Sequence, residues 1–149
     1  MHIWVDADAC PRPVKEILFR ASGRKNVPLT LVANKPQPIP PSPLIRCLVV
    51  GSGFDVADRT IVEKLEAGDL VVSADIPLAA HAIAKGAQVL DPRGQLLGPE
   101  NIGERLSVRN FLDELRGSGV ETGGPAVFGP KDRQAFANQL DRILASLPG

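Results

Sequence analysis

The chain has 149 residues, a mass of 15.8 kDa and equal numbers of acidic and basic side chains, 17 of each. A chain of this length forms one domain with one core. Its composition, 44% hydrophobic and 23% charged, excludes wholesale disorder. The zero net charge excludes the strong overall field of a constitutive nucleic-acid binder and leaves room for a local basic patch.

The sequence predicts a cytoplasmic protein. No apolar run approaches the roughly 20 residues of a membrane span, so no membrane association is expected. The first residues, Met-His-Ile-Trp-Val-Asp, lack the basic and apolar regions of a signal peptide. Two cysteines, Cys10 and Cys47, are too few for a disulfide scaffold. We therefore expect residues 1–149 to form a single domain.

Short apolar runs rich in Val, Ile and Leu predict the strands. Continuous rather than alternating hydrophobicity is typical of strands buried on both faces of a parallel sheet. The runs are, in chain order, 3–5, 29–33, 45–50, 70–72 and 89–90. Helical spacing between them predicts a first helix from about Val14 that stops at Gly23, a second over 56–67 and a third over 76–85. This alternation predicts an α/β fold, a mostly parallel central sheet flanked by helices.

Two segments interrupt the alternation. The proline-rich segment 35–43 predicts an extended connector in place of a crossover helix. Residues 91–94, Asp-Pro-Arg-Gly, predict a tight turn into a short edge hairpin that ends near Leu97. Two further helices are expected over 100–116 and 131–147, with a mobile glycine-rich loop over 117–130 between them.

Aspartates follow the carboxyl ends of the predicted strands. They are Asp6 and Asp8 after the first, Asp55 and Asp58 after the third, Asp75 after the fourth and Asp91 after the fifth. Carboxyl ends of parallel strands meet at one edge of the sheet, where open α/β folds place their ligands. Asp69 precedes its strand and is expected at the opposite edge, outside this site.

Converging carboxylates indicate a metal site. They raise one another's pKa unless a cation neutralises them. Mg²⁺ or Mn²⁺, hard cations that prefer oxygen ligands, would suit such a set. These ions serve phosphoryl chemistry by activating water and stabilising the leaving oxygen. The acids therefore favour phosphate-ester hydrolysis.

Each acid also has a purely structural interpretation. Asp75 stands where a helix N-cap belongs, and Asp55 followed by Asp58 fits a cap and a first-turn acid that complements the helix dipole. Asp91 fits a turn-forming residue. Asp6 ends a buried strand and is the hardest to explain in this way. One shared site explains the whole set better than a series of unrelated caps at one edge.

Other residues with possible chemistry are few. Lys131 and Arg133 open the last predicted helix, either as a solvated helix face or, if the glycine-rich loop folds over the site, as contacts to a phosphate backbone. Cys10 is expected to be a packed thiol, although a helix N-terminus can lower a thiol pKa. Five Phe, one Trp and no Tyr make a base-stacking platform an unfavoured hypothesis.

Six short motifs spread over nearly the whole chain are informative together. They are Val-Asp-Ala-Asp-Ala-Cys-Pro at 5–11, Val-Ala-Asn at 32–34, Gly-Phe-Asp-Val-Ala-Asp at 53–58, Ser-Ala-Asp-Ile-Pro-Leu-Ala at 73–79, Leu-Asp-Pro-Arg-Gly at 90–94 and Gly-Pro-Ala-Val-Phe-Gly-Pro-Lys-Asp-Arg-Gln at 124–134. These motifs resemble the YaiI/YqxD family of bacterial proteins. That family is grouped with PIN-like domains, Rossmann-like folds whose members are typically metal-dependent ribonucleases. The resemblance implies an acidic metal site of Asp6, Asp58 and Asp75, with Asp8 and Asp91 as further candidates.

The leading hypothesis is a Mg²⁺- or Mn²⁺-dependent phosphodiesterase that acts on RNA or single-stranded nucleic acid. In it Asp6, Asp58 and Asp75 bind metal. Asp8 orients the attacking water or holds a second ion, and Lys131 and Arg133 steer the phosphate.

Two alternatives stay open. A haloacid-dehalogenase-like phosphatase would use Asp6 as covalent nucleophile, Asp8 as acid/base and Ser73 as a phosphate contact, but no lysine follows Ser73 at a convincing position. A non-catalytic protein would use the acidic edge to bind a metal, a nucleotide or a protein partner.

Overall fold

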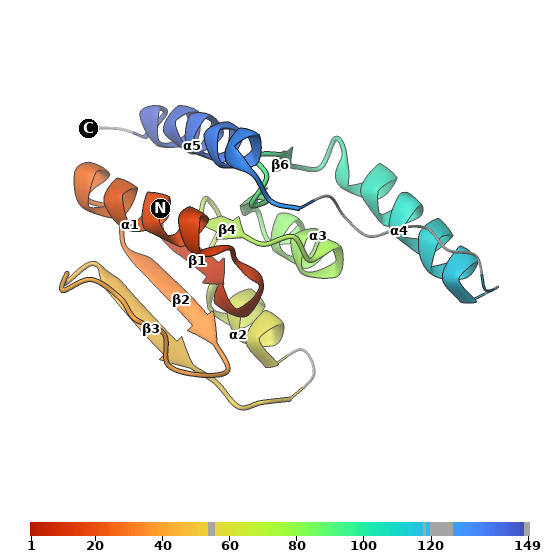
Figure 1. Cartoon of the computed structure of the whole chain (residues 1–149), viewed down its shortest axis with the longest axis horizontal. Helices are drawn as coiled ribbons and strands as arrows, with labels where there is room; N and C mark the ends of the chain where they lie inside the picture. The colour runs from red at the N-terminus through yellow and green to blue at the C-terminus, as the bar shows by residue number, and fades with distance from the viewer. Residues whose placement is uncertain (54–55, 118, 120–126, 148–149) are drawn as a thin grey trace.

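A six-stranded sheet organises the fold, seen in a computed structural model that describes residues 1–53, 56–117, 119 and 127–147 (Figure 1). The strands are β1 (Ile3–Asp6), β2 (Leu29–Ala33), β3 (Ile45–Val49), β4 (Leu70–Val72), β5 (Gln88–Leu90) and β6 (Leu96–Leu97). Their spatial order is β3-β2-β1-β4-β5-β6. The first five strands pair in parallel and β6 pairs antiparallel to β5, which confirms the predicted α/β sheet and edge hairpin.

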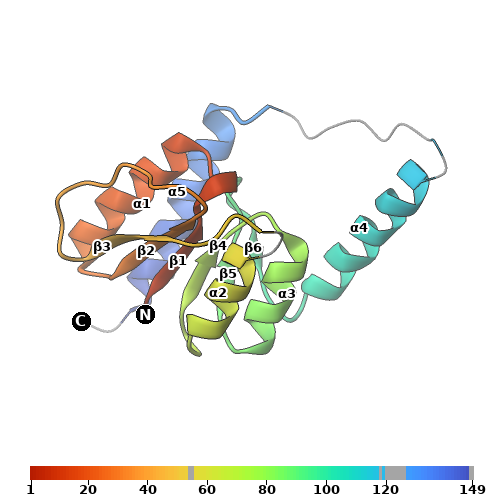
Figure 2. The ribbon, with the colours of Figure 1, turned by 90° about the horizontal axis from the view of Figure 1, so that it is seen from below.

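Helices cover both faces of the sheet. On one face lie α1 (Arg12–Lys25) and α5 (Pro130–Ala145), and on the other α2 (Val56–Lys64) and α3 (Ile76–Ala84) (Figures 1 and 2). A short 3₁₀ helix, η1 (Ala7–Ala9), follows β1. The remaining helix, α4 (Ile102–Gly117), contacts α3 and extends away from the sheet. In the described part of the chain, no helix is long and apolar enough to cross a membrane.

The core has two layers, one on each face of the sheet. Val5 and Leu31 belong to the layer under α1 and α5, where Phe136 is fully buried. Trp4, next to Val5 in the chain, belongs to the layer under α2 and α3 together with Ile61. Neighbouring strand residues point to opposite faces, so the central strands are buried from both sides. Each such buried side chain stabilises the fold by about 1.5–3 kcal/mol.

Strand β3 departs from the prediction for residues 45–50. That run was expected to be buried on both faces, yet Arg46 is exposed and Val49 is 47% exposed. The reason is the connector that precedes it. Residues 35–43 form no helix, as predicted, so no crossover helix covers this strand and β3 forms the edge of the sheet.

The helix ends differ in part from the prediction. Helix α1 continues through Gly23 and ends at Asn26, which adopts the left-handed conformation with φ 57° and closes the helix in place of glycine. Helix α5 begins at Pro130 and stops at Ala145, so the predicted helix over 131–147 is shifted by one or two residues. The predicted mobile loop over 117–130 falls largely on residues 118 and 120–126, which lie outside the described residues.

The turn between β5 and β6 holds the start of α5. Arg93 Nη1 lies 2.8 Å from Asp132 Oδ2, and the same oxygen accepts a 3.0 Å hydrogen bond from the Gly129 N–H. Gly94 has φ +91°, and a Cβ placed on it would lie 2.5 Å from the carbonyl carbon of Ala135. Glycine is therefore required here both by its conformation and by the close approach of α5.

We predict that Gly94→Ala destabilises the fold much more than Gly68→Ala. Gly68 has a similar φ of +89°, but a Cβ there meets nothing within 4 Å. The Gly68 variant should lose about 1–2 kcal/mol from left-handed strain alone. The Gly94 variant should lose roughly 1–3 kcal/mol more because it also overpacks against the α5 backbone. Urea unfolding of both variants measures this difference, and equal losses would contradict the close contact between turn and helix.

Candidate functional site

The acids gather where the direction of the sheet's connections reverses. From β1 the chain passes to β2 and β3 on one side, and β4 and β5 lie on the other side. The carboxyl ends of β1 and β4 therefore flank a topological switch point, the usual ligand position in open α/β sheets. Asp6 ends β1, and Asp75 follows β4. We call this place the acidic edge and define it by Asp6, Asp8 and Asp75.

Asp6 is the centre of the acidic edge. Burial raises the pKa of Asp6 above its usual 3.8, and the charges of Asp75 and Asp8 raise it further. A hydrogen bond from Ser73 acts in the opposite direction. The structure thus brings Asp75 and Asp8 each within electrostatic reach of Asp6.

Ser73 links two of these acids. Its side chain is buried, with a residue exposure of 2%. Its Oγ donates to Asp6 Oδ2 at 3.2 Å and accepts from the Asp75 N–H at 3.0 Å. Sequence analysis assigned Ser73 a role only in the phosphatase alternative, as a phosphate contact. Its place directly after a buried strand is the signal that could have marked it as a residue that orients Asp6.

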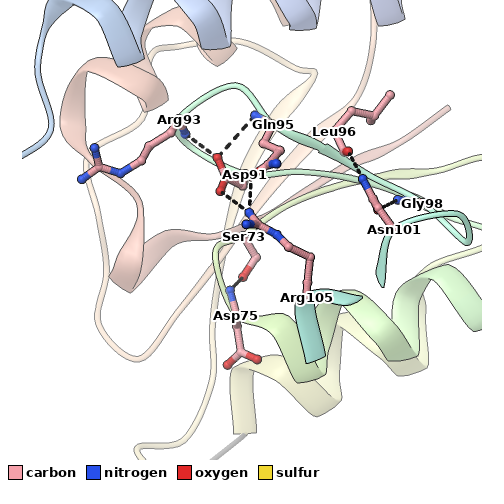
Figure 3. A network of polar contacts seen from close by, with 9 residues as sticks. All are labelled: Ser73, Asp75, Asp91, Arg93, Gln95, Leu96, Gly98, Asn101 and Arg105. Atoms are coloured by element: carbon pink, nitrogen blue, oxygen red, sulfur yellow. Dashed lines mark hydrogen bonds and ion pairs between the residues drawn. The ribbon is translucent and has the colours of Figure 1, made fainter. Parts of the chain in front are cut away.

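Asp75 is the N-cap of α3, as its structural interpretation required. Its Oδ1 accepts a 2.9 Å hydrogen bond from the Leu78 N–H. Among the described residues, Oδ2 has no hydrogen-bond partner. In Figure 3 the Asp75 carboxylate points away from Asp91. A capping role for one oxygen leaves the other available to a ligand.

Asp8 ties the proline-rich connector to the acidic edge. Its Oδ2 accepts from the Asn34 N–H at 2.8 Å and its Oδ1 from Gln37 Nε2 at 3.3 Å. Gln37 in turn accepts from Lys15 Nζ at 2.6 Å. Sequence analysis assigned no role to Gln37, and it named Asn34 only as the end of the Val-Ala-Asn motif. Their contacts with Asp8 could not be predicted, because they depend on the pairing of β1 with β2 and on the path of the connector.

Asp58 and Asp91 each lie where a local structural role accounts for them. Asp58 is half-buried in the first turn of α2, where a carboxylate complements the helix dipole. Asp91 accepts from the N–H groups of Arg93 at 2.7 Å and Gln95 at 3.4 Å (Figure 3). Arg105 Nη2 lies 3.9 Å from Asp91 Oδ2. The contacts of Asp91 are those of a turn-forming residue.

The acidic edge has the donors for a hard cation but not a closed cage. Among the residues that the structure describes, no three His, Cys, Asp or Glu side chains lie close enough together to hold one ion. Asp55 lies outside those residues. Mg²⁺ usually keeps several waters and needs only one or two carboxylates. Asp6, whose charge is unfavourable in the folded chain, together with the free oxygen of Asp75, fits that requirement.

Basic side chains lie at the same end of the sheet. Lys131 and Arg133 are exposed in the first turn of α5. The ion pair between Arg93 and Asp132 holds that turn beside the carboxyl end of β5. The exposed cations of this turn therefore lie at the same end of the sheet as the acidic edge.

Cys10 is a packed thiol, as predicted. It is buried in the layer under α1 and α5. Burial raises the pKa of its thiol to about 12. At neutral pH it is therefore protonated and does not serve as a nucleophile.

We predict that Asp6→Asn stabilises the protein at neutral pH when divalent cations are removed with EDTA. Between pH 3.8 and the raised pKa of folded Asp6, the folded chain binds more protons than the unfolded chain, so Asp6 lowers stability as pH rises through this window. Asparagine removes that cost and can still accept from Ser73. Urea midpoints should be higher for the variant at neutral pH.

The gain should vanish below pH 3.8, where Asp6 is protonated in both states. Glu63→Gln makes the same chemical change at an exposed position of α2 and should show no comparable gain. A variant at Asp6 that is no more stable than wild type at neutral pH would contradict the electrostatic cost.

Comparison with known proteins gives the family. The family described as "Uncharacterized BCR, YaiI/YqxD family" matches residues 4–146. A UPF0178 protein of Thioalkalivibrio sulfidiphilus is 63% identical over 145 residues, 97% of this chain and 99% of that protein. A UPF0178 protein of Halorhodospira halophila is 62% identical over 148 residues, 99% of this chain and 98% of that protein. No solved structure matches the chain. This chain therefore belongs to the YaiI/YqxD family, whose curated relatives carry the name UPF0178.

Proposed function

We propose that this protein is a Mg²⁺- or Mn²⁺-dependent phosphodiesterase that hydrolyses RNA or single-stranded nucleic acid. The observation that carries the proposal is the meeting of Asp6 and Asp75 at the switch point between β1 and β4. The basic first turn of α5 at the same end of the sheet adds a means of attracting phosphate. The resemblance to PIN-like domains supports the same chemistry.

In this proposal Asp6 and Asp75 hold the cation. Ser73 fixes the direction of Asp6 through its 3.2 Å hydrogen bond, and the N-cap contact fixes Asp75. A bound Mg²⁺ or Mn²⁺ supplies charge stabilisation and a water of lowered pKa. Asp8, held by the Asn34 N–H and by Gln37 of the connector, orients the attacking water.

The remaining candidates have supporting roles. Asp58 adds negative charge at the start of α2. Asp91 we assign to the turn rather than to the ion, because it already accepts two backbone N–H groups and faces Arg105. Lys131 and Arg133 contact the phosphate backbone of the substrate, and such contacts make binding dependent on salt.

The contacts favour this proposal over the covalent phosphatase. A covalent phosphatase would need Asp8 free to exchange a proton with the leaving group. Both Asp8 oxygens instead accept hydrogen bonds, one from the Asn34 N–H and one from Gln37 Nε2. These contacts hold the carboxylate in place, which suits a group that orients water.

We predict that Asp75→Asn abolishes Mn²⁺-dependent cleavage of end-labelled single-stranded RNA while the fold persists. Asparagine is as good an N-cap as aspartate, so α3 keeps its cap and only the charge is lost. Cleavage should fall by at least about 100-fold, since even residues that only support a metal ligand cost 10–100-fold when changed. Circular dichroism confirms that the variant is folded.

The matched control is Asp141→Asn, an exposed acid of α5 whose single partner among the described residues is Arg24 on the surface. It should cleave like wild type. Equal cleavage by wild type and Asp75→Asn would contradict the assignment of the site. Failure of wild type to cleave any of several RNA and DNA substrates would overturn the proposal in favour of a non-catalytic binding protein.

The role of Lys131 and Arg133, in the first turn of α5, is tested in the same cleavage assay. The double variant Lys131→Ala/Arg133→Ala should raise KM and reduce the salt dependence by about one unit of slope for each lost phosphate contact, with kcat nearly unchanged. Arg142→Ala, exposed at the other end of α5, is the control. A double variant that behaves like Arg142→Ala would exclude this helix from substrate binding.

A further inference from the structure

A hollow lies on the sheet face of α2 and α3, over the amino-terminal parts of β1 and β2 and along the edge strand β3. Its volume is about 530 Å³, within the range of small-molecule sites. It exists because α2 packs against β1 and β2 and leaves β3 without a helix above it. The acidic edge lies at the opposite, carboxyl ends of these strands. We call this hollow the amino-end pocket and define it by His2, Trp4, Thr30, Arg46, Leu48 and Lys64.

Strand register places the pocket's side chains in one row. Trp4 pairs with Thr30, and Thr30 pairs with Arg46, so the three lie side by side across β1, β2 and β3. Paired residues of a parallel sheet point to the same face. Leu48 lies two residues beyond Arg46 on this face, and Lys64 reaches the pocket from the last turn of α2.

The floor of the pocket is held rigidly. The rings of His2 and Trp4 are stacked, with centroids 4.2 Å apart and planes 20° from parallel. Asp69, only 8% exposed, accepts from Trp4 Nε1 at 3.1 Å and from the His2 N–H at 3.0 Å. His2 Nε2 lies 2.8 Å from Thr30 Oγ1. Asp69, which sequence analysis placed outside any site, thus holds an aromatic platform in place.

The charge of the pocket favours an anion. Arg46 and Lys64 are exposed on two sides of it, and no acidic residue lines it. In the described part of the chain, neither cation has a hydrogen bond or an ion pair. Burial lowers the pKa of His2, so its ring is neutral at neutral pH and the two cations supply the charge.

We propose that the amino-end pocket binds a nucleoside phosphate. The phosphate lies between Arg46 and Lys64, which approach from β3 and α2. The base lies against the apolar and aromatic lining formed by Trp4, His2 and Leu48. Flat aromatic and aliphatic surfaces accept any base, and the pair of cations selects the charged ligand. This site does not depend on the acidic edge.

The test uses Trp4, the only tryptophan of the chain, as a fluorescent reporter. Wild type is titrated with AMP in EDTA, a condition in which the acidic edge repels phosphate. We expect a saturable change in tryptophan fluorescence. The double variant Arg46→Ala/Lys64→Ala should bind AMP at least about tenfold more weakly, a loss of the size expected for charge-assisted contacts. Lys25→Ala, an exposed lysine at the end of α1, should bind like wild type.

Two further titrations separate the parts of the ligand. Inorganic phosphate and adenosine should each bind at least about tenfold more weakly than AMP, since each makes only part of the contacts. Phosphate that binds as tightly as AMP would overturn the nucleoside part of the proposal, and adenosine that binds as tightly would overturn the role of the cations. Equilibrium dialysis that detects no bound AMP would overturn the proposal as a whole.

Two variants distinguish failure of the nucleotide-binding proposal from failure of the proposed phosphodiesterase activity. Asp75→Asn should leave AMP binding unchanged, because Asp75 lies at the other end of the strands. Arg46→Ala/Lys64→Ala should leave RNA cleavage unchanged. If Asp75→Asn removed AMP binding, the nucleotide would occupy the acidic edge and the amino-end pocket would be excluded.

Discussion

The parallel pairing of β1 with β2 on one side and β4 on the other is the constraint on which the rest of the structure depends. Ile3 and Val5 are fully buried at the centre of the sheet, so the register of β1 cannot slip without moving its apolar side chains out of the core. That register sets Asp6 beside the end of β4. It also sets Trp4 beside Thr30 at the other end. Both candidate sites are consequences of where this one strand lies.

The acidic edge has the properties of a site held at the expense of stability. Asp6 is a half-buried carboxylate with two like charges near it, and Ser73 only partly offsets that cost. A fold optimised only for stability would place an amide or a serine there. Functional sites commonly keep such unfavourable groups because the ligand relieves them. The cation that we propose would do so.

Much of the fold could be predicted from the sequence. The apolar runs placed β1, β2, β4 and β5 closely, because buried parallel strands leave a continuous hydrophobic signal. The exposure of β3 could not be predicted from its own residues, since it depends on whether a helix covers the strand. The prediction that α1 stops at Gly23 was wrong for a related reason. Glycine ends a helix only where the chain must turn, and Asn26 makes that turn.

The sequence was enough to predict which acids lie at the candidate site, but not which residues hydrogen-bond to them. The position of Asp6 and Asp75 after two strands was enough to bring them to one edge. The contacts of Ser73 with Asp6 and of Gln37 with Asp8 join residues far apart in the chain, so no local pattern reveals these pairs. The amino-end pocket could not be predicted from the sequence for the same reason. Trp4, Thr30 and Arg46 come from three strands and meet only through register.

The most direct test of the central claim is the effect of Mn²⁺ on the thermal unfolding midpoint of wild type and Asp6→Asn. A ligand that binds only the folded state stabilises it by about 2.7 kcal/mol at a concentration 100 times its Kd. We expect the wild-type midpoint to rise with Mn²⁺ concentration and to saturate, and the midpoint of Asp6→Asn to stay at its value in EDTA. An equal rise in both proteins, or no rise in wild type, would contradict a cation site at the acidic edge.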